Sequence, residues 1–174
     1  VVREKELGSI VNFYATPVRK MEFLLGKQLP YIVVSLISFF GLVTFAIYVF
    51  QVPLKGSLFT LTLGVFLYII CTTAIGLFIS SFAKTQIAAL MGTAILTLLP
   101  TIQFSGLKEP VSSLEGVAQY IGNIFPVTYF INISRGVFSK NVSFSELRFE
   151  FFVLSISIFV ILYCSYLVLN KQEK

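Results

Sequence analysis

The sequence predicts an all-α integral membrane protein with four membrane-spanning helices. Of its 174 residues, 56% are hydrophobic and only 12% are charged, whereas soluble domains carry about 25% charged residues. Four stretches almost free of charge are each long enough to cross a bilayer, which takes about 20 mostly apolar residues. A soluble fold of this size has too little interior to bury so much apolar surface, so we expect the membrane to be the solvent.

Residues 1–27 precede the first of these stretches and begin with charged, amphipathic sequence. The i, i+3, i+4, i+7 spacing of one helical face joins Leu7, Ile10, Val11 and Tyr14. Thr16 and Pro17 are predicted to end this helix and to cap the next one, with the proline at its first position. From the pattern alone the helix either rests on lipid or docks on a partner, and its acidic residues are unusual for lipid headgroups, which are often anionic.

Residues 28–107 are predicted to hold three spans, at 28–54, 56–83 and 85–107, and the apolar run 151–172 holds the fourth, at 151–170. Backbone polar groups in lipid must be paired within their own segment, so each span is expected to be a helix. Lys84 alone separates the second span from the third, which predicts a tight turn. Pro100 is expected to loosen or kink the third span.

Residues 108–150 form the long connection before the last span. Its first helix-like patch places Val111, Leu114, Val117, Ala118 and Ile121 on roughly one face. Pro126 suits the first turn of another short helix. We expect short outer helices that lie at, or dip into, the membrane interface.

The distribution of basic residues predicts the orientation. One face of the membrane would carry Arg3, Lys5, Arg19, Lys20, Lys27, Lys84, Lys171 and Lys174, and the other Lys55, Lys108, Arg135, Lys140 and Arg148. The positive-inside rule then places both ends of the chain, including the tail 171–174, in the cytoplasm. The chain would be a multi-pass protein of the inner (plasma) membrane.

Several kinds of chemistry are excluded or disfavoured by composition. The chain has no Asp, His or Trp, which removes most metal sites and the Ser-His-Asp and Cys-His arrangements of hydrolases. The spans carry no charged residue in their central parts, which disfavours ion-coupled transport and voltage sensing. Cys71 and Cys164 lie in apolar runs and predict packing thiols rather than a disulfide. The basic residues form no stripe, so we expect no nucleic-acid partner.

Small residues recur every fourth position within the second and third spans. Thr72, Gly76 and Ser80 form one such row, and Ala88 and Gly92 form another. Rows of this kind let helices approach closely. The alternative is that these residues line a translocation pathway.

Short strings distributed along the whole chain carry a family resemblance. The chain opens with REKELGSIVNFYATP, EFLLGKQLPY enters the first span, and VPLKGSL, GLFISSFAKTQIAA, FSGL and NIFPVTYFINISRGVF follow. In this order and spacing they resemble the membrane subunits of ABC-2 type exporters, whose drug-efflux branch is the more similar one. The residues that match the family's opening motifs are Arg3, Glu4, Glu6, Gly8, Ser9, Ile10, Thr16, Pro17, Gly26, Lys27 and Pro30.

This resemblance implies the permease of an ATP-driven exporter, with the opening segment as a coupling helix held by a separate cytoplasmic ATP-binding cassette subunit. Coupling would then involve Arg3, Glu4, Glu6, Leu7, Ile10, Phe13, Thr16 and Pro17. Two such membrane subunits, identical or different, would work with two ATPase subunits, and this chain would correspond to the last four spans of a longer subunit. An interior with little charge suits hydrophobic or amphipathic cargo, drug-like or lipid-like.

ATP and Mg²⁺ would be bound by the partner, because this chain has no G-x-x-x-x-G-K-[ST] phosphate loop. We therefore expect no enzyme activity and no cofactor in this chain itself. A rival interpretation from another class is a membrane scaffold or assembly factor that recruits a cytoplasmic partner through the same helix and transports nothing. An ATP-binding subunit encoded next to this chain would favour transport over the scaffold.

Overall fold

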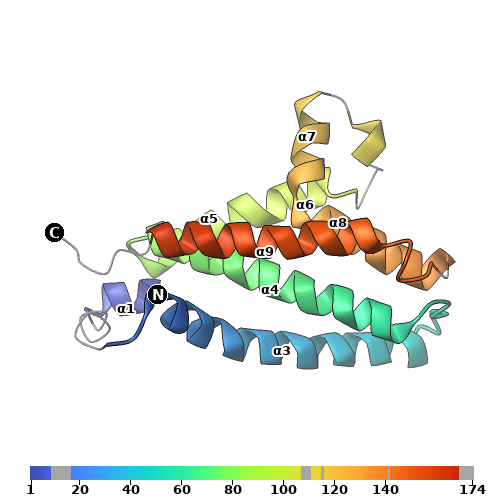
Figure 1. Cartoon of the computed structure of the whole chain (residues 1–174), viewed down its shortest axis with the longest axis horizontal. Helices are drawn as coiled ribbons and strands as arrows, with labels where there is room; N and C mark the ends of the chain where they lie inside the picture. Colours follow the sequence, from blue (N-terminus) through green and yellow to red (C-terminus); the bar gives the residue numbers. More distant parts are fainter. Residues whose placement is uncertain (9–16, 107–110, 115, 141, 169–174) are drawn as a thin grey trace.

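A computed structural model shows a bundle of long helices (Figure 1) and describes residues 1–8, 17–106, 111–114, 116–140 and 142–168. The elements are α1 Val2–Glu6, α3 Lys20–Tyr48, α4 Leu58–Phe82, α5 Gln86–Thr93, the π-helical turn η1 Ala94–Leu98, α6 Leu99–Phe104, the 3-10 turn η2 Val111–Ser113, α7 Val117–Ile124, α8 Pro126–Arg135, the π-helical turn η3 Gly136–Lys140 and α9 Arg148–Val168. Within these residues four helical segments are long and apolar enough to cross a membrane, namely Lys20–Tyr48, Leu58–Phe82, Gln86–Phe104 and Arg148–Val168. The predicted all-α membrane class with four spans is therefore confirmed.

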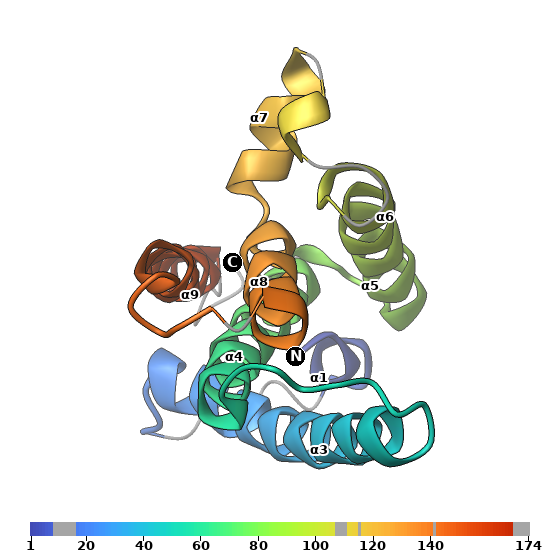
Figure 2. The same ribbon diagram turned by 90° about the vertical axis from the view of Figure 1, so that its right-hand side faces the viewer.

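Helix α4 occupies the centre of the bundle, with α3 on one side and α8 and α9 on another (Figure 2). The main core cluster joins Leu61 of α4 to Ile133 of α8 and Leu154 of α9, all at most 1% exposed. We call one end of the bundle the α1 end, because α1, the α4–α5 turn and Val168 lie there. The other end, where the turns 49–57 and 142–147 lie, is the α8 end.

The helix containing the first span begins earlier than its apolar stretch. Helix α3 starts at Lys20, and Pro17 lies before it outside regular secondary structure, so the prediction of proline at the first helical position was wrong. The backbone N–H of Arg19 donates to the carboxylate of Glu22 at 3.0 Å, which caps this end of the helix instead. Long charged side chains can extend past an apolar surface to water. Helix α3 can therefore include charged residues before its apolar stretch begins.

The opening helix is shorter than its periodicity predicted. Helix α1 ends at Glu6, and Gly8 follows with φ 71°, a left-handed conformation that glycine adopts without strain at a helix C-terminus. Leu7 therefore does not continue a single helical face toward Ile10, Val11 and Tyr14, which lie outside the described residues.

The third span loosens in the turn that precedes Pro100, as predicted. The turn Ala94–Leu98 is π-helical, and Pro100 lies in the first turn of α6, which follows. Proline cannot donate a backbone hydrogen bond and its ring clashes with the carbonyl four residues earlier, so a wider turn before it relieves the clash.

The two helices between the third and fourth spans differ in their role. Helix α7 projects from the bundle and exposes Val117, Tyr120 and Ile124, each more than 70% exposed. Helix α8 instead packs between α4 and α9, with Val127 and Ile133 buried. The sequence predicted a surface or interfacial position for both helices and did not show that α8 completes the core.

One buried polar side chain joins α3 to α4. Gln28 is 1% exposed, and its amide nitrogen donates to the carbonyl of Ile70 at 2.7 Å and to the hydroxyl of Thr73 at 2.8 Å. A paired amide in a membrane bundle satisfies polar groups that lipid cannot satisfy. Gln28 therefore fixes the register of α3 against α4 near the α1 end.

Replacing Gln28 by leucine should destabilise the chain by about 1 kcal/mol, the usual size of an interhelical hydrogen bond in a membrane protein. Reversible unfolding of the purified chain in mixed micelles measures this loss. Gln103→Leu is the matched control, because Gln103 is exposed on α6. Equal losses for the two variants would show that the Gln28 bonds contribute no stability.

Candidate functional site

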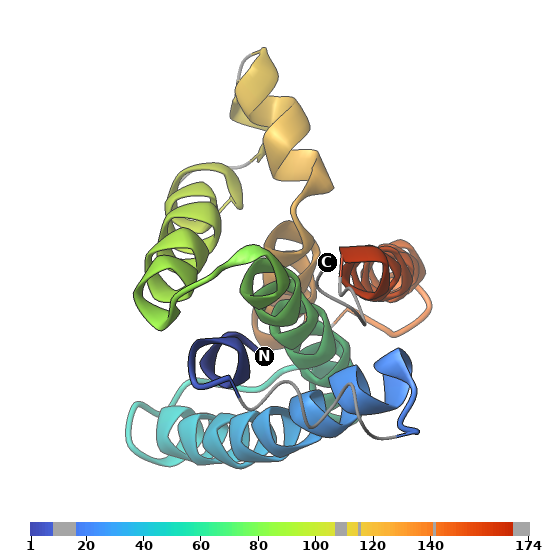
Figure 3. The same ribbon diagram turned by 90° about the vertical axis from the view of Figure 1, so that its left-hand side faces the viewer.

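Helix α1 lies between α3 and α5, beside the end of α4 (Figure 3). The backbone N–H of Val2 donates to the hydroxyl of Ser80 on α4 at 3.1 Å. Leu24 of α3 and Leu77 of α4 pack together next to it, and both are buried. This short helix is thus held against the bundle by polar contacts around a small apolar cluster.

An ion pair joins α1 to α3. The ammonium of Lys27 donates to the carboxylate of Glu4, and the two side chains are 40% and 24% exposed. Partial burial raises the pKa of Glu4, but the hydrogen bond and the positive charge of Lys27 act in the other direction, and the net pKa lies below its ordinary value. The Glu4 carboxylate is therefore ionised at neutral pH and pairs with Lys27.

A third contact joins α1 to α5. The Glu6 carboxylate accepts hydrogen bonds from the backbone N–H of Gln86 at 3.2 Å and from its side-chain amide at 2.8 Å. The Thr85 hydroxyl caps the same helix by accepting from the N–H of Ala88 at 3.2 Å. A carboxylate at a helix N-terminus is favoured by unpaired N–H groups and by the helix dipole. Acidic residues of α1 thereby contact two spans, and its backbone contacts a third.

A cavity of about 670 Å³ opens between α1, α3 and α4. It is lined by Val1, Arg3, Glu4, Leu7, Lys27, Gln28, Tyr31, Thr73, Gly76, Leu77 and Ser80. Polar groups from all three elements line it, although it borders helices that are apolar enough to span a membrane. Such a cavity can hold a molecule that is partly polar and partly apolar.

Gly76 borders this cavity rather than a neighbouring helix. A Cβ atom built on Gly76 would meet no atom within 4 Å, whereas one on Gly92 would touch the Cγ2 of Ile79 at an ordinary 3.6 Å. Ser80 lines the cavity too, and Thr72 donates only to carbonyls of its own helix. The row Thr72, Gly76 and Ser80 therefore makes no close helix contact at Gly76.

The structure places the predicted coupling residues unequally. Arg3, Glu4 and Leu7 line the cavity, Glu6 contacts α5, and Pro17 lies exposed before α3. Ile10, Phe13 and Thr16 lie outside the described residues. Ala88 stands exposed in the first turn of α5.

Sequence reasoning missed the partners of this site. Lys27 and Gln28 were read as the entry to a span, and Gln86 was not singled out. The position of Lys27 next to an apolar stretch was a signal, because an ammonium there is stabilised by a carboxylate partner. Nothing in the sequence says that this partner is Glu4, 23 residues earlier.

The described residues hold no group of three or more metal-ligating side chains. Cys71 is buried and Cys164 is partly exposed, and both are free thiols. Glu4 and Lys27 form an ion pair that borders the cavity, and the hydroxyl residues Thr73 and Ser80 line it as well.

Membrane-spanning helices, a partly polar cavity at one end of the bundle and a short helix in contact with three spans describe a multi-pass membrane protein. A family model described as "ABC-2 family transporter protein" matches residues 1–168, so the chain belongs to this family.

Curated relatives carry transporter names. The chain is 27% identical over 143 residues to the "Probable multidrug ABC transporter permease YbhR" of Escherichia coli K12, covering 82% of this chain and 39% of the relative. It is 29% identical over 157 residues to the "Inner membrane transport permease YhhJ" of the same strain, covering 88% and 41%. It is 27% identical over 175 residues to "ABC transporter G family member 20" of Dictyostelium discoideum, covering 99% and 24%.

The chain thus spans about two fifths of the length of the two bacterial relatives. No solved structure matches it.

Proposed function

We propose that this chain is the membrane-spanning part of an ATP-driven exporter, and that α1 transmits movement from a separate ATP-binding cassette subunit to the spans. The observation that carries the proposal is that α1 contacts α3 through Glu4, α4 through Val2 and α5 through Glu6. A rigid displacement of α1 would therefore displace three spans together. ATP and Mg²⁺ would be held by the partner subunit.

The orientation in this proposal places the α1 end in the cytoplasm of a cell with an inner membrane. Support comes from the basic residues Arg19, Lys20, Lys27 and Lys84 at that end. A second membrane subunit would pack on exposed apolar surface such as that of Ile87, Leu90 and Met91 on α5. These three side chains are each more than 60% exposed.

The cargo would be hydrophobic or amphipathic, drug-like or lipid-like. The partly polar cavity between α1, α3 and α4 supports this class, because it borders apolar spans and is lined by Glu4, Gln28 and Thr73 as well as by Leu77. The name of one bacterial relative, the probable multidrug permease YbhR, supports the same class.

The test is the double variant Glu4→Ala and Glu6→Ala in the full-length subunit, reconstituted with its ATPase. We expect export and cargo-stimulated ATP hydrolysis to fall at least about five-fold, the low end of usual coupling free energies. Glu146→Ala is the control, because Glu146 is an exposed acid at the α8 end.

Normal export by the Glu4→Ala, Glu6→Ala variant would refute the coupling role of α1. A subunit that binds its cytoplasmic partner without any ATP-dependent transport of a screened cargo panel would favour the scaffold interpretation. Membrane fractionation measures the inserted amount of each variant in parallel, so that loss of protein is not mistaken for loss of coupling.

A further inference from the structure

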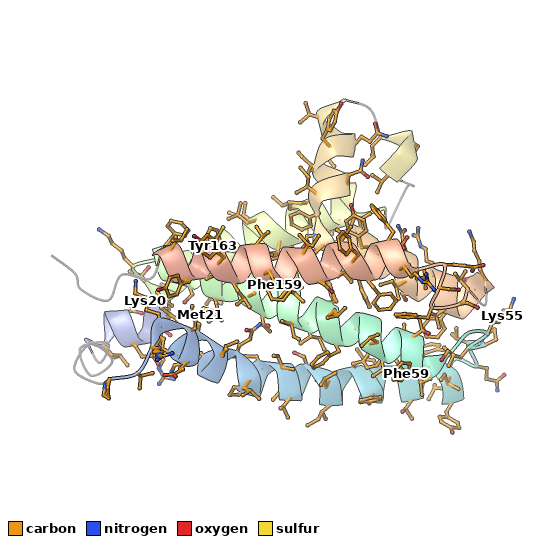
Figure 4. The ribbon with its side chains drawn as sticks, in the orientation of Figure 1. Lys20, Met21, Lys55, Phe59, Phe159 and Tyr163 are labelled. Carbon is orange, nitrogen blue, oxygen red and sulfur yellow. The ribbon has the colours of Figure 1, made fainter. Side chains whose placement is uncertain are left out.

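An apolar groove runs between the first turns of α3 and the last turns of α9. Its volume is about 770 Å³, and it is lined by Met21, Leu25, Phe159, Val160, Leu162, Tyr163 and Tyr166. Figure 4 shows Met21 on α3 below Phe159 and Tyr163 on α9. Both helices are apolar enough to span a membrane, so the groove opens on the surface that lipid or another membrane helix must cover.

The groove is formed by matched helical spacing on its two walls. On α9, Phe159, Tyr163 and Tyr166 follow the i, i+4, i+7 spacing of one helical face. On α3, Met21 and Leu25 share a face through their i, i+4 spacing. Leu162 is 9% exposed and forms the floor, whereas Phe159 and Tyr163 are 74% and 62% exposed on the rim. The wall from Phe159 to Tyr166 covers about 10 Å of helix axis at 1.5 Å per residue.

Lys20 lies at the mouth of this groove. The ammonium of Lys20 lies 5.3 Å from the ring centroid of Tyr166 (Figure 4). In the part of the chain that the structure describes, Lys20 has no carboxylate partner, because the ion pairs there join Glu4 to Lys27 and to the amino terminus. The Glu22 carboxylate, two residues away, accepts from the backbone of Arg19 instead.

We infer that this groove binds one anionic phospholipid, with an acyl chain between α3 and α9 and its phosphate near Lys20. The apolar lining suits a hydrocarbon chain. The ammonium of Lys20 suits the negative charge of a phosphate. Tyr163 and Tyr166 have polar tips, and tyrosine is favoured at the depth of lipid headgroups. An apolar membrane helix in the same groove would leave Lys20 without a counter-charge, whereas an anionic headgroup supplies one, and this difference in charge favours the lipid.

The absence of tryptophan from the chain allows a direct test. Met21→Trp places a single fluorophore in the groove, and Phe59→Trp places one near the opposite end of the bundle, where Phe59 is 74% exposed. Each variant of the full chain is reconstituted in phosphatidylcholine vesicles that contain brominated phosphatidylglycerol or brominated phosphatidylcholine. Bromine in the acyl chain quenches a tryptophan that it contacts.

We expect brominated phosphatidylglycerol to quench Met21→Trp with an apparent affinity roughly three- to five-fold above that of the neutral lipid, the effect of one basic residue near a headgroup. The quenching of Phe59→Trp should not change when Lys20→Gln is added, because Lys20 lies at the other end of the bundle. Adding Lys20→Gln to Met21→Trp should remove the preference, whereas Lys55→Gln, which changes the lysine near Phe59, should not (Figure 4). High salt should weaken the preference, since the site is exposed.

Two results would overturn the inference. Equal quenching of Met21→Trp by the two lipids, or a preference that survives Lys20→Gln, would show that Lys20 selects no headgroup. Weak quenching of Met21→Trp by both lipids, with normal quenching of Phe59→Trp, would show that protein covers the groove.

Discussion

Gly76→Leu is expected to reduce transport at least about five-fold while leaving the chain folded and inserted. A Cβ atom at this position meets nothing within 4 Å, and the side chain would extend into the cavity between α1, α3 and α4. Filling space that an occupant needs costs about 1–3 kcal/mol of its binding free energy, which corresponds to roughly a 5- to 150-fold loss of transport. Cargo-dependent export in proteoliposomes measures the loss, and a fluorescent fusion measures insertion.

Gly64→Leu is the matched control on the same helix. A Cβ atom on Gly64 would lie 2.9 Å from the Cγ2 of Ile133, a branched side chain that is fully buried between α4 and α8. The same substitution should therefore overpack the core and destabilise the fold by about 1–3 kcal/mol or more. Both variants replace glycine by leucine in α4, so they differ chiefly in what the new side chain meets.

The pair of variants distinguishes the two interpretations of the small-residue row. If Gly76→Leu fails to fold as Gly64→Leu does, Gly76 serves helix packing after all. If Gly76→Leu folds and transports normally, the cavity lies outside the pathway. A folded variant that does not transport is the result that the structure favours.

The four spans were predictable because one strong constraint dominates them. A helix that crosses lipid must be long and uncharged through its middle, so hydropathy and length alone located Leu58–Phe82 and Arg148–Val168 closely. The helix ends were less predictable. Helix α3 begins eight residues before its apolar stretch, because Lys20 and Lys27 can extend toward water while the helix continues.

The role of α8 could not be read from its pattern. An amphipathic helix at an interface and one packed against α4 and α9 show the same periodicity, because both need a single apolar face. Ile133 on α8 is fully buried, whereas Val117 and Ile124 on α7 are exposed. The two helices differ in what covers their apolar faces, and the local sequence does not specify this.

The candidate site was predictable only in part for the same reason. Resemblance pointed to Glu4 and Glu6, but the contacts with Lys27 and Gln86 join residues 23 and 80 positions apart. The four-residue spacing of Thr72, Gly76 and Ser80 is common to close helix contacts and to cavity walls. The structure separates these cases through what a side chain at Gly76 would meet.

In the ion pair between Glu4 and Lys27, the two charges can be swapped between the two positions by substitution. Both side chains are partly exposed, so the pair contributes at most about 1 kcal/mol to folding. Its removal should leave the bundle intact and loosen α1 from α3. Glu4 and Lys27 are therefore suited to testing transmission separately from stability.

Glu4→Lys is expected to reduce ATP-driven transport by about 5- to 150-fold, the range that follows from coupling free energies of 1–3 kcal/mol. It brings two ammonium groups together at the junction of α1 and α3, so α1 should separate from the span that it would move. Lys27→Glu should act similarly by facing Glu4 with a second carboxylate. Combining Glu4→Lys with Lys27→Glu restores opposite charges, so transport per ATP hydrolysed should recover most of its value. Two single losses that simply add in the double variant would show that the two residues act independently.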